Sequence, residues 1–246
     1  MRASAGAGWD LQDRPGAMAT SLTPVNDTGA VSRPVLEALA GGVLPDWERM
    51  AGRIELRRLA PGQALFHAGA PATDLYVVRS GILRLAYEGA DGRHWIKGFV
   101  PEGRFFASAR ALAGDGRAAF RADALEASRV ECLPYALVEQ LGREHMRWQQ
   151  AIAAGFRLFG LRKEQREHDL LTLDAAGRYA RFMAEFATVA ARIPLKDVAA
   201  YVGVTPVALS RIRRRLGLVA AARARAATAV RPCVHERPGK GGAGIW

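Results

Sequence analysis

The residues whose types and spacing point to chemistry lie in one segment, 195–216, with the sequence LKDVAAYVGVTPVALSRIRRRL. Its second half concentrates the arginines Arg211, Arg213, Arg214 and Arg215. A guanidinium group is always charged and donates hydrogen bonds in a planar fork that suits phosphates and base edges. The segment therefore predicts non-covalent recognition of a polyanion rather than bond-making chemistry.

Turn and helix-start signals place these arginines on the second of two short helices. Gly203 can take the left-handed backbone conformation of a tight turn without a steric penalty. Thr205 followed by Pro206 is typical of a helix start, with a hydroxyl cap and then proline at the first helical position. We therefore predict a helix, a turn at Gly203 and a second helix from Pro206.

At about 100° per residue, the second helix has two faces. Leu209, Ile212 and Leu216 share one face, which we expect to pack on the preceding helix. The opposite face and its edges carry Val207, Ser210, Arg211, Arg214, Arg213 and Arg215. One apolar stripe and one arginine-rich stripe are what reading of the DNA major groove requires. The simpler alternative is a small helical hairpin with a solvated basic face.

The segment resembles the helix-turn-helix of the Crp/Fnr family of bacterial transcription regulators. The matching residues are Val198, Ala199, Gly203, Val204, Thr205, Ala208, Leu209, Ser210 and Arg211. The resemblance implies a homodimer whose recognition helices enter major grooves about one DNA turn apart on a pseudo-palindromic operator. It also implies RNA polymerase as a partner.

Each residue of the predicted interface has an expected role. Arg211 should contact a base edge, preferably guanine O6 and N7, and Ser210 a base or a phosphate. Thr205 should cap the helix and approach a phosphate. Val207 departs from the glutamate of many relatives and would meet a thymine methyl group instead of cytosine. Phosphate neutralisation is expected from Lys196, Arg213, Arg214 and Arg215.

The charge distribution also favours a polyanion partner. From residue 192 to the C-terminus, eleven Lys and Arg residues face two acidic residues, so +9 of the chain's +11 lies there. An acidic lipid surface is the rival, but this region lacks the bulky apolar helix face that membrane insertion needs. Residues 218–246 show no period-two alternation, so we expect a basic, disordered tail rather than a β-hairpin wing.

The remaining composition indicates a cytoplasmic protein. Two cysteines, Cys132 and Cys233, exclude a disulfide scaffold and suggest a reducing compartment. No run of about 18 apolar residues predicts a membrane span, and the N-terminus lacks the apolar core of a signal peptide. Residues 1–30 are rich in Ala, Gly, Pro, Ser and Thr, and we expect a disordered extension there.

Residues 31–135 are expected to form a sensor domain of α+β class. After short helices, strands of alternating polarity follow one another at close spacing, separated by glycine and proline turns, which indicates a double-stranded β-roll. The run PGQALFHAGAPATDLYVVRSGILRL resembles the cyclic-nucleotide-binding domain of the same family. These glycines are also explained as corners of a β-roll, so the motif predicts the fold and not a ligand.

The family's nucleotide pocket uses a Gly-Glu pair followed by arginine, and this chain departs from it. Aligning GRFFASARALAGDGRAAF places Ala107 and Ser108 at the Gly-Glu pair, while Arg117 matches the arginine. A serine cannot replace a carboxylate that accepts from the ribose, and the lost charge-assisted hydrogen bond is worth about 1.5–3 kcal/mol. We therefore expect no response to cyclic AMP, no bound cofactor, and either another small-molecule effector or none.

Residues 136–171 are expected to form a long dimerisation helix, as the resemblance implies, followed by a helix-turn-helix domain at 172–217. Four residues at helical spacing form the predicted dimer seam: Trp148, Ile152, Gly155 and Phe159. The alternative is a helix that packs only on its own β-roll. Asp174 is expected to cap the helix that follows.

No pattern in the sequence predicts catalysis. The five histidines show no metal-ligand spacing with one another or with cysteine, and no nucleophile elbow, P-loop or zinc-protease motif is present. We therefore expect a transcription regulator, with no metal site and no enzymatic activity. Two rival functions remain: a small-molecule sensing module with secondary DNA binding, and an interaction protein whose basic end contacts a partner or RNA.

Overall fold

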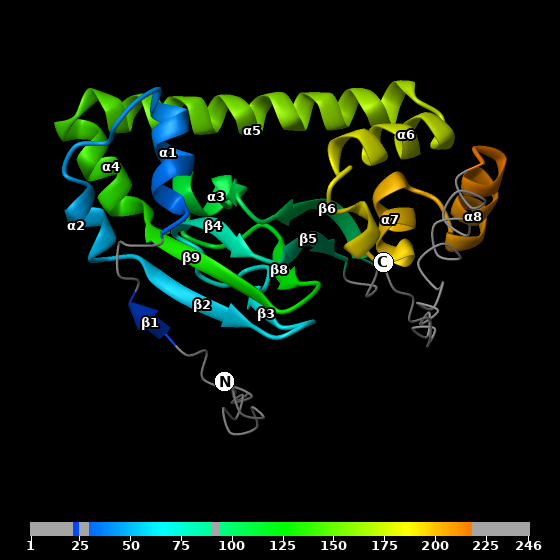
Figure 1. Cartoon of the computed structure of the whole chain (residues 1–246), viewed down its shortest axis with the longest axis horizontal. Helices are drawn as coiled ribbons and strands as arrows, with labels where there is room; N and C mark the ends of the chain where they lie inside the picture. Colours follow the sequence, from blue (N-terminus) through cyan, green and yellow to red (C-terminus); the bar gives the residue numbers. More distant parts are fainter. Residues whose placement is uncertain (1–21, 25–29, 90–93, 218–246) are drawn as a thin grey trace, which may run out of the picture.

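The computed structural model describes residues 22–24, 30–89 and 94–217, and it shows a β-roll, a long helix and a C-terminal helical unit (Figure 1). The long helix α5 runs the length of the molecule and links the roll to the helices at its far end. The predicted α+β class and β-roll are confirmed. Predictions for 1–21, 25–29 and the tail 218–246 fall outside the described residues.

Two antiparallel sheets form the roll. The first has the order β1 (Leu22–Pro24), β2 (Glu55–Leu59), β9 (Ser128–Pro134), β4 (Asp74–Ser80) and β7 (Phe105–Phe106). The second has the order β3 (Ala64–Phe66), β8 (Arg121–Ala124), β5 (Ile82–Glu88) and β6 (His94–Pro101). Apolar side chains from both sheets meet in one core, and the central strands β4, β5 and β9 are buried over consecutive residues.

Strand β1 corrects the prediction of a wholly disordered extension over residues 1–30. Residues 22–24 pair antiparallel with β2, so that Leu22 lies opposite Arg57 and Pro24 opposite Glu55. Pairing satisfies backbone groups of β2 that would otherwise form a sheet edge. Backbone pairing of this kind needs no apolar period, and the sequence pattern therefore gave no sign of it.

Helices cover one side of the roll. They are α1 (Ser32–Ala40), α2 (Trp47–Ala51), α4 (Tyr135–Glu144) and α5 (Met146–Thr172). The single helix predicted over 136–171 is wrong, because His145 has an extended backbone (φ −137°, ψ 124°) that separates α4 from α5. A short helix that was not predicted, α3 (Ala109–Ala113), follows β7.

The residues of the predicted dimer seam pack within the protomer. Trp148 has no exposed surface, stacks on Trp47 with ring centroids 6.0 Å apart, and donates from Nε1 to the Pro45 carbonyl at 2.8 Å. Phe159 packs on Phe105 at 5.2 Å, and Gly155 is buried against the same ring. Ile152 joins this cluster. Trp148 and Gly155 are therefore buried within the protomer, whereas Ile152 and Phe159 are only partly buried, and the dimer seam itself stays a prediction.

The C-terminal unit consists of α6 (Ala175–Glu185), a 3₁₀ turn (Ala190–Arg192), α7 (Leu195–Val202) and α8 (Pro206–Arg215). As predicted, Asp174 caps α6 by accepting from the Gly177 N–H at 2.7 Å. The unit rests on strands β5 and β6, where Phe99 packs against Phe182, Phe186 and Tyr201 at 5.6–6.1 Å. The β-roll and the helical unit thus share one apolar core.

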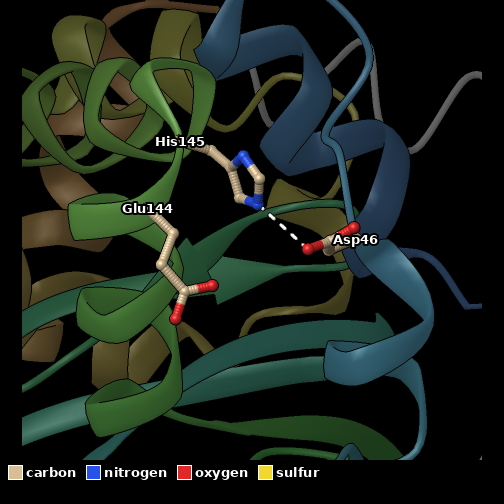
Figure 2. A group of neighbouring side chains, drawn as sticks. All are labelled: Asp46, Glu144 and His145. Carbon is tan, nitrogen blue, oxygen red and sulfur yellow. Dashed lines mark hydrogen bonds and ion pairs between the residues drawn. The ribbon is translucent and has the colours of Figure 1, made fainter.

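A charged cluster ties α2 to the break between α4 and α5 (Figure 2). His145 Nε2 lies 3.0 Å from an Asp46 carboxylate oxygen, and the Arg49 guanidinium is paired with both Asp46 and Glu144. The three residues Asp46, Glu144 and His145 bring ligand-type atoms within 4.8 Å of one another. Arg49 pairs with both carboxylates and His145 also lies against Asp46, so the arrangement is that of a salt-bridged clamp rather than a cation site.

The clamp predicts a specific pH dependence of stability. Hydrogen bonds from Arg49 and then Gln140 lower the pKa of Glu144 from 4.5 to about 2. A depressed native pKa means that the stabilisation is complete above the unfolded pKa of 4.5 and is lost as pH falls towards 2. Urea unfolding between pH 2.5 and 6 should show a smaller acid loss for Glu144→Gln than for the wild type. Equal losses would show that the clamp contributes nothing.

Candidate nucleic-acid interface

The turn between α7 and α8 has the local chemistry that the sequence predicted. Gly203 has φ +79°, and its N–H closes α7 on the Ala200 carbonyl at 3.2 Å. Thr205 is extended, and its hydroxyl accepts from the Ala208 N–H at 3.2 Å. Pro206 occupies the first helical position, where a missing N–H costs nothing. These local interactions set the direction in which α8 leaves the turn.

The inner face of α8 is narrower than expected. Leu209 is 1% exposed and packs in the core shared with α7, and Ile212 is partly buried against the same core. Leu216, in contrast, is 45% exposed and lies beyond the last residue of the helix. The prediction that Leu216 packs on the preceding helix is wrong, since the helix ends before bringing it inward.

The outer face of α8 is basic and unpaired. Val207 is 63% exposed, and Ser210, Arg211, Arg214 and Arg215 are exposed. Over the part of the chain that the structure describes, no carboxylate forms an ion pair with an α8 arginine. Lys196 is exposed on the adjoining helix α7. The structure therefore brings most of the predicted contact residues onto accessible surface around one short helix.

Two predicted contact residues have more constrained surroundings. Arg213 is half-buried at the edge of the face, and its Nε has no hydrogen-bond partner among the described residues. Ser210 donates its hydroxyl proton to the Pro206 carbonyl at 2.9 Å. Its oxygen remains free to accept, so the present rotamer suits a donor on a base edge rather than a phosphate oxygen.

Buried polar contacts that the sequence pattern did not reveal hold the helical unit in place. Arg84 of β5 forms ion pairs with Asp123 of β8 at 2.7 Å and with Asp197 of α7 at 2.9 Å. Arg178 of α6 donates to the Val202 carbonyl at 2.7 Å, at the end of α7. Arg166 of α5 donates to the Tyr201 carbonyl and lies 3.9 Å over its ring. All of these join residues far apart in sequence, and no local spacing signals them.

The residues aligned with a nucleotide pocket make structural contacts in this chain. Ser108 is fully buried, and its hydroxyl accepts from the Ala111 and Ala119 N–H groups at 3.4 and 3.2 Å. Arg117 is exposed and donates to the Gly69 carbonyl at 2.8 Å. Ala107 packs against the core beneath α5. Ser108 thus closes a corner of the fold, and Arg117 braces a surface turn.

Aromatic side chains pack together in the core of the roll. Phe66 has ring centroids 5.3 Å from Tyr76, 6.3 Å from Phe106 and 5.7 Å from Phe120. Burial strongly raises the pKa of the Tyr76 hydroxyl, which is therefore neutral at any physiological pH.

No helix among the described residues has the length and apolar character needed to cross a bilayer.

Comparison with known proteins identifies the domain and the fold. A family model described as "Cyclic nucleotide-binding domain" matches residues 56–145. FixK2 from Bradyrhizobium japonicum is 22% identical in sequence, with a TM-score of 0.58 over 67% of this chain and 85% of that chain. CLP from Xanthomonas campestris, described as a c-di-GMP responsive global regulator, is 20% identical, with a TM-score of 0.58 over 71% and 91%.

A putative cAMP-binding regulatory protein from Silicibacter pomeroyi is 22% identical, with a TM-score of 0.52 over 76% of this chain and 88% of that chain. No curated protein sequence matches this chain. TM-scores of 0.52–0.58 at identities of 20–22% establish that this chain shares the fold of these three proteins. Residues 56–145 therefore match a cyclic nucleotide-binding domain, and the chain shares the fold of FixK2 and CLP, in agreement with the resemblance drawn from its sequence.

Proposed function

We propose that this protein is a sequence-specific DNA-binding transcription regulator of Crp/Fnr type. The observation that supports this most directly is α8, a capped ten-residue helix with one buried anchor and an outer face of unpaired arginines. Unpaired guanidinium groups on a short helix suit the phosphates and guanine edges of a major groove. The regulatory role stated for CLP, a protein of the same fold, agrees with this proposal.

In this mechanism, two copies of the chain place their α8 helices in successive major grooves of a pseudo-palindromic operator. Arg211 reads a guanine, while Lys196, Arg214 and Arg215 neutralise phosphates. Thr205 keeps the N-terminus of α8 close to the DNA backbone, and Val207 meets a thymine methyl group. RNA polymerase is the partner on which bound dimers act. The domain boundaries proposed are 31–135 for the sensor, 136–171 for the linking helices and 172–217 for the DNA-binding domain.

Substitution of Arg211 tests base reading. Operators are first selected from a random duplex pool and then titrated by fluorescence anisotropy. Arg211→Ala should lose about 1–3 kcal/mol, or roughly 5- to 150-fold, on the selected duplex and little on random DNA. Arg143→Ala, an exposed arginine of α4, serves as the matched control. If Arg211→Ala keeps specific binding and deletion of residues 218–246 abolishes it, the helix-turn-helix is not the reader.

The exposed face of α5 is the surface we propose for dimerisation, in place of the buried seam. Its outward heptad positions carry the apolar or small residues Met146, Ala153, Phe156, Gly160 and Leu170, with Gln149, Lys163 and Glu167 at the positions between them. Met146 is 72%, Phe156 40% and Leu170 47% exposed in the protomer. Spacing of this kind forms the seam of a paired helix, and Gly160 permits close approach.

A charge placed on this stripe should separate the protomers. Phe156→Glu buries an unpaired carboxylate in the proposed seam, so sedimentation equilibrium should show a monomer at concentrations where the wild type is dimeric. Leu161→Glu is the matched control, because Leu161 is 55% exposed but lies off the stripe. A dimeric Phe156→Glu protein would refute this seam.

The rival function, cyclic-nucleotide sensing, is tested by calorimetry. We propose that the protein does not respond to cyclic AMP, because Ser108 is buried as a helix cap and Arg117 is engaged by Gly69. Titration with cyclic AMP or cyclic GMP should give no saturable heat at ligand concentrations up to the millimolar range. Tight, saturable heat would instead support a sensing module built on a different pocket geometry.

A further inference from the structure

A surface groove lies between α1, the turn that joins β6 to β7, and α5. Its volume is about 400 Å³, which is within the range of small-molecule sites. One wall is apolar and comes from Val35 and Leu39 of α1 together with Phe105 of β7. The other side carries two guanidinium groups, Arg104 from the turn and Arg162 from α5. Helix α1 packs directly on α5 (Figure 1).

Neither Arg104 nor Arg162 has a carboxylate in direct contact with its guanidinium group among the described residues. Neither forms an ion pair or a side-chain hydrogen bond there. Of the neighbouring carboxylates, Glu102 pairs with Arg192 at 2.6 Å, whereas Glu185 accepts from the Tyr201 hydroxyl at 3.3 Å and attracts Arg162 only from beyond ion-pair distance. Two like charges facing one groove destabilise each other unless an anion joins them.

The electrostatics of Arg162 agree with this geometry. Burial and, next, the charge of Arg104 lower the pKa of the Arg162 guanidinium, while Glu185 opposes the shift. The arginine stays protonated at physiological pH. The protein therefore keeps two positive charges close together, and an incoming dianion would relieve their repulsion.

This groove is separate from the surfaces discussed above. Arg162 continues the helix face that carries Trp148, Gly155 and Phe159 towards the roll, so it does not point along the exposed stripe of α5. Ser108 and Arg117, which align with the family's nucleotide pocket, do not line the groove. Helix α8, which carries the arginines of the proposed DNA interface, lies at the far end of the molecule (Figure 1).

We propose that the groove binds a small organic dianion of the phosphate monoester class. Arg104 and Arg162 would hold the phosphate, and Leu39 and Phe105 would contact an apolar or planar substituent. Guanidinium groups bind phosphate through paired, charge-assisted hydrogen bonds, and the apolar wall favours an ester over the inorganic ion. A ligand in this position bridges α1 and the roll to α5, the helix that leads to the DNA-binding unit.

Phenyl phosphate is the probe for this site, titrated calorimetrically into the full chain at pH 7.5. Binding should be saturable and tighter than binding of inorganic phosphate. Arg104→Gln and Arg162→Gln should each weaken it at least tenfold, and the double variant should abolish it. Arg143→Gln, which removes an exposed arginine elsewhere, should leave binding unchanged. Affinity should also fall at pH 5, where the phosphate ester is largely a monoanion.

Three results would overturn the proposal. The first is the absence of saturable heat at millimolar phenyl phosphate, and the second is equal affinity of the wild type and the double variant. The third is a change of oligomeric state in the double variant with phosphate binding intact, which would assign the arginines to an interface. Thermal unfolding of both single variants controls for folding, and we expect no loss of stability, because removing one charge removes a repulsion.

Discussion

The packing of the helical unit on strands β5 and β6 is the constraint on which the rest of the structure depends. Phe99 lies among three rings of the unit, and α7 adds Val198 and Val202 to the same core. Helix α8 itself contributes only one fully buried side chain, Leu209. A ten-residue helix with so small an anchor is marginal by itself. Its position therefore derives from α7, and the position of α7 derives from the β-roll.

Ion pairs of Arg84 also hold α7 on the β-roll, in addition to the apolar packing. Its guanidinium lies between two nearly buried carboxylates, Asp123 in the roll and Asp197 in α7. Removing one member of such a group leaves a buried charge uncompensated, which typically costs about 3–5 kcal/mol. Strand β8, which carries Asp123, follows the segment that holds Ser108 and Arg117. A structural change near Ser108 and Arg117 would therefore reach α7 through β8 and through the ion pairs that Arg84 makes with Asp123 and Asp197.

The parts of the fold that were predictable from sequence are those decided locally. The Gly203 turn and the Thr205 and Asp174 caps involve residues within four positions of one another. The predicted seam shows the limit: periodicity established that Trp148 and Phe159 share a face, but not that the face packs on Trp47 and Phe105. Strand β1, the break at His145 and the Arg84 ion pairs all depend on distant partners. No local pattern encodes them.

The inner face of α5 changes from apolar to polar along the helix. This change explains how one helix packs on the β-roll at one end and contacts α6 and α7 at the other. Over the roll, the face is apolar, with Trp148 and Gly155 buried. Past Phe159 it becomes polar, where Arg166 meets Tyr201 of α7 and Asp169 meets Arg181 of α6. Arg162 lies at the boundary between these regions, beside the apolar wall of the groove and without an ion-pair partner among the described residues. An anion bound to the Arg162 guanidinium would therefore lie where it can influence how the helical unit packs on the β-roll.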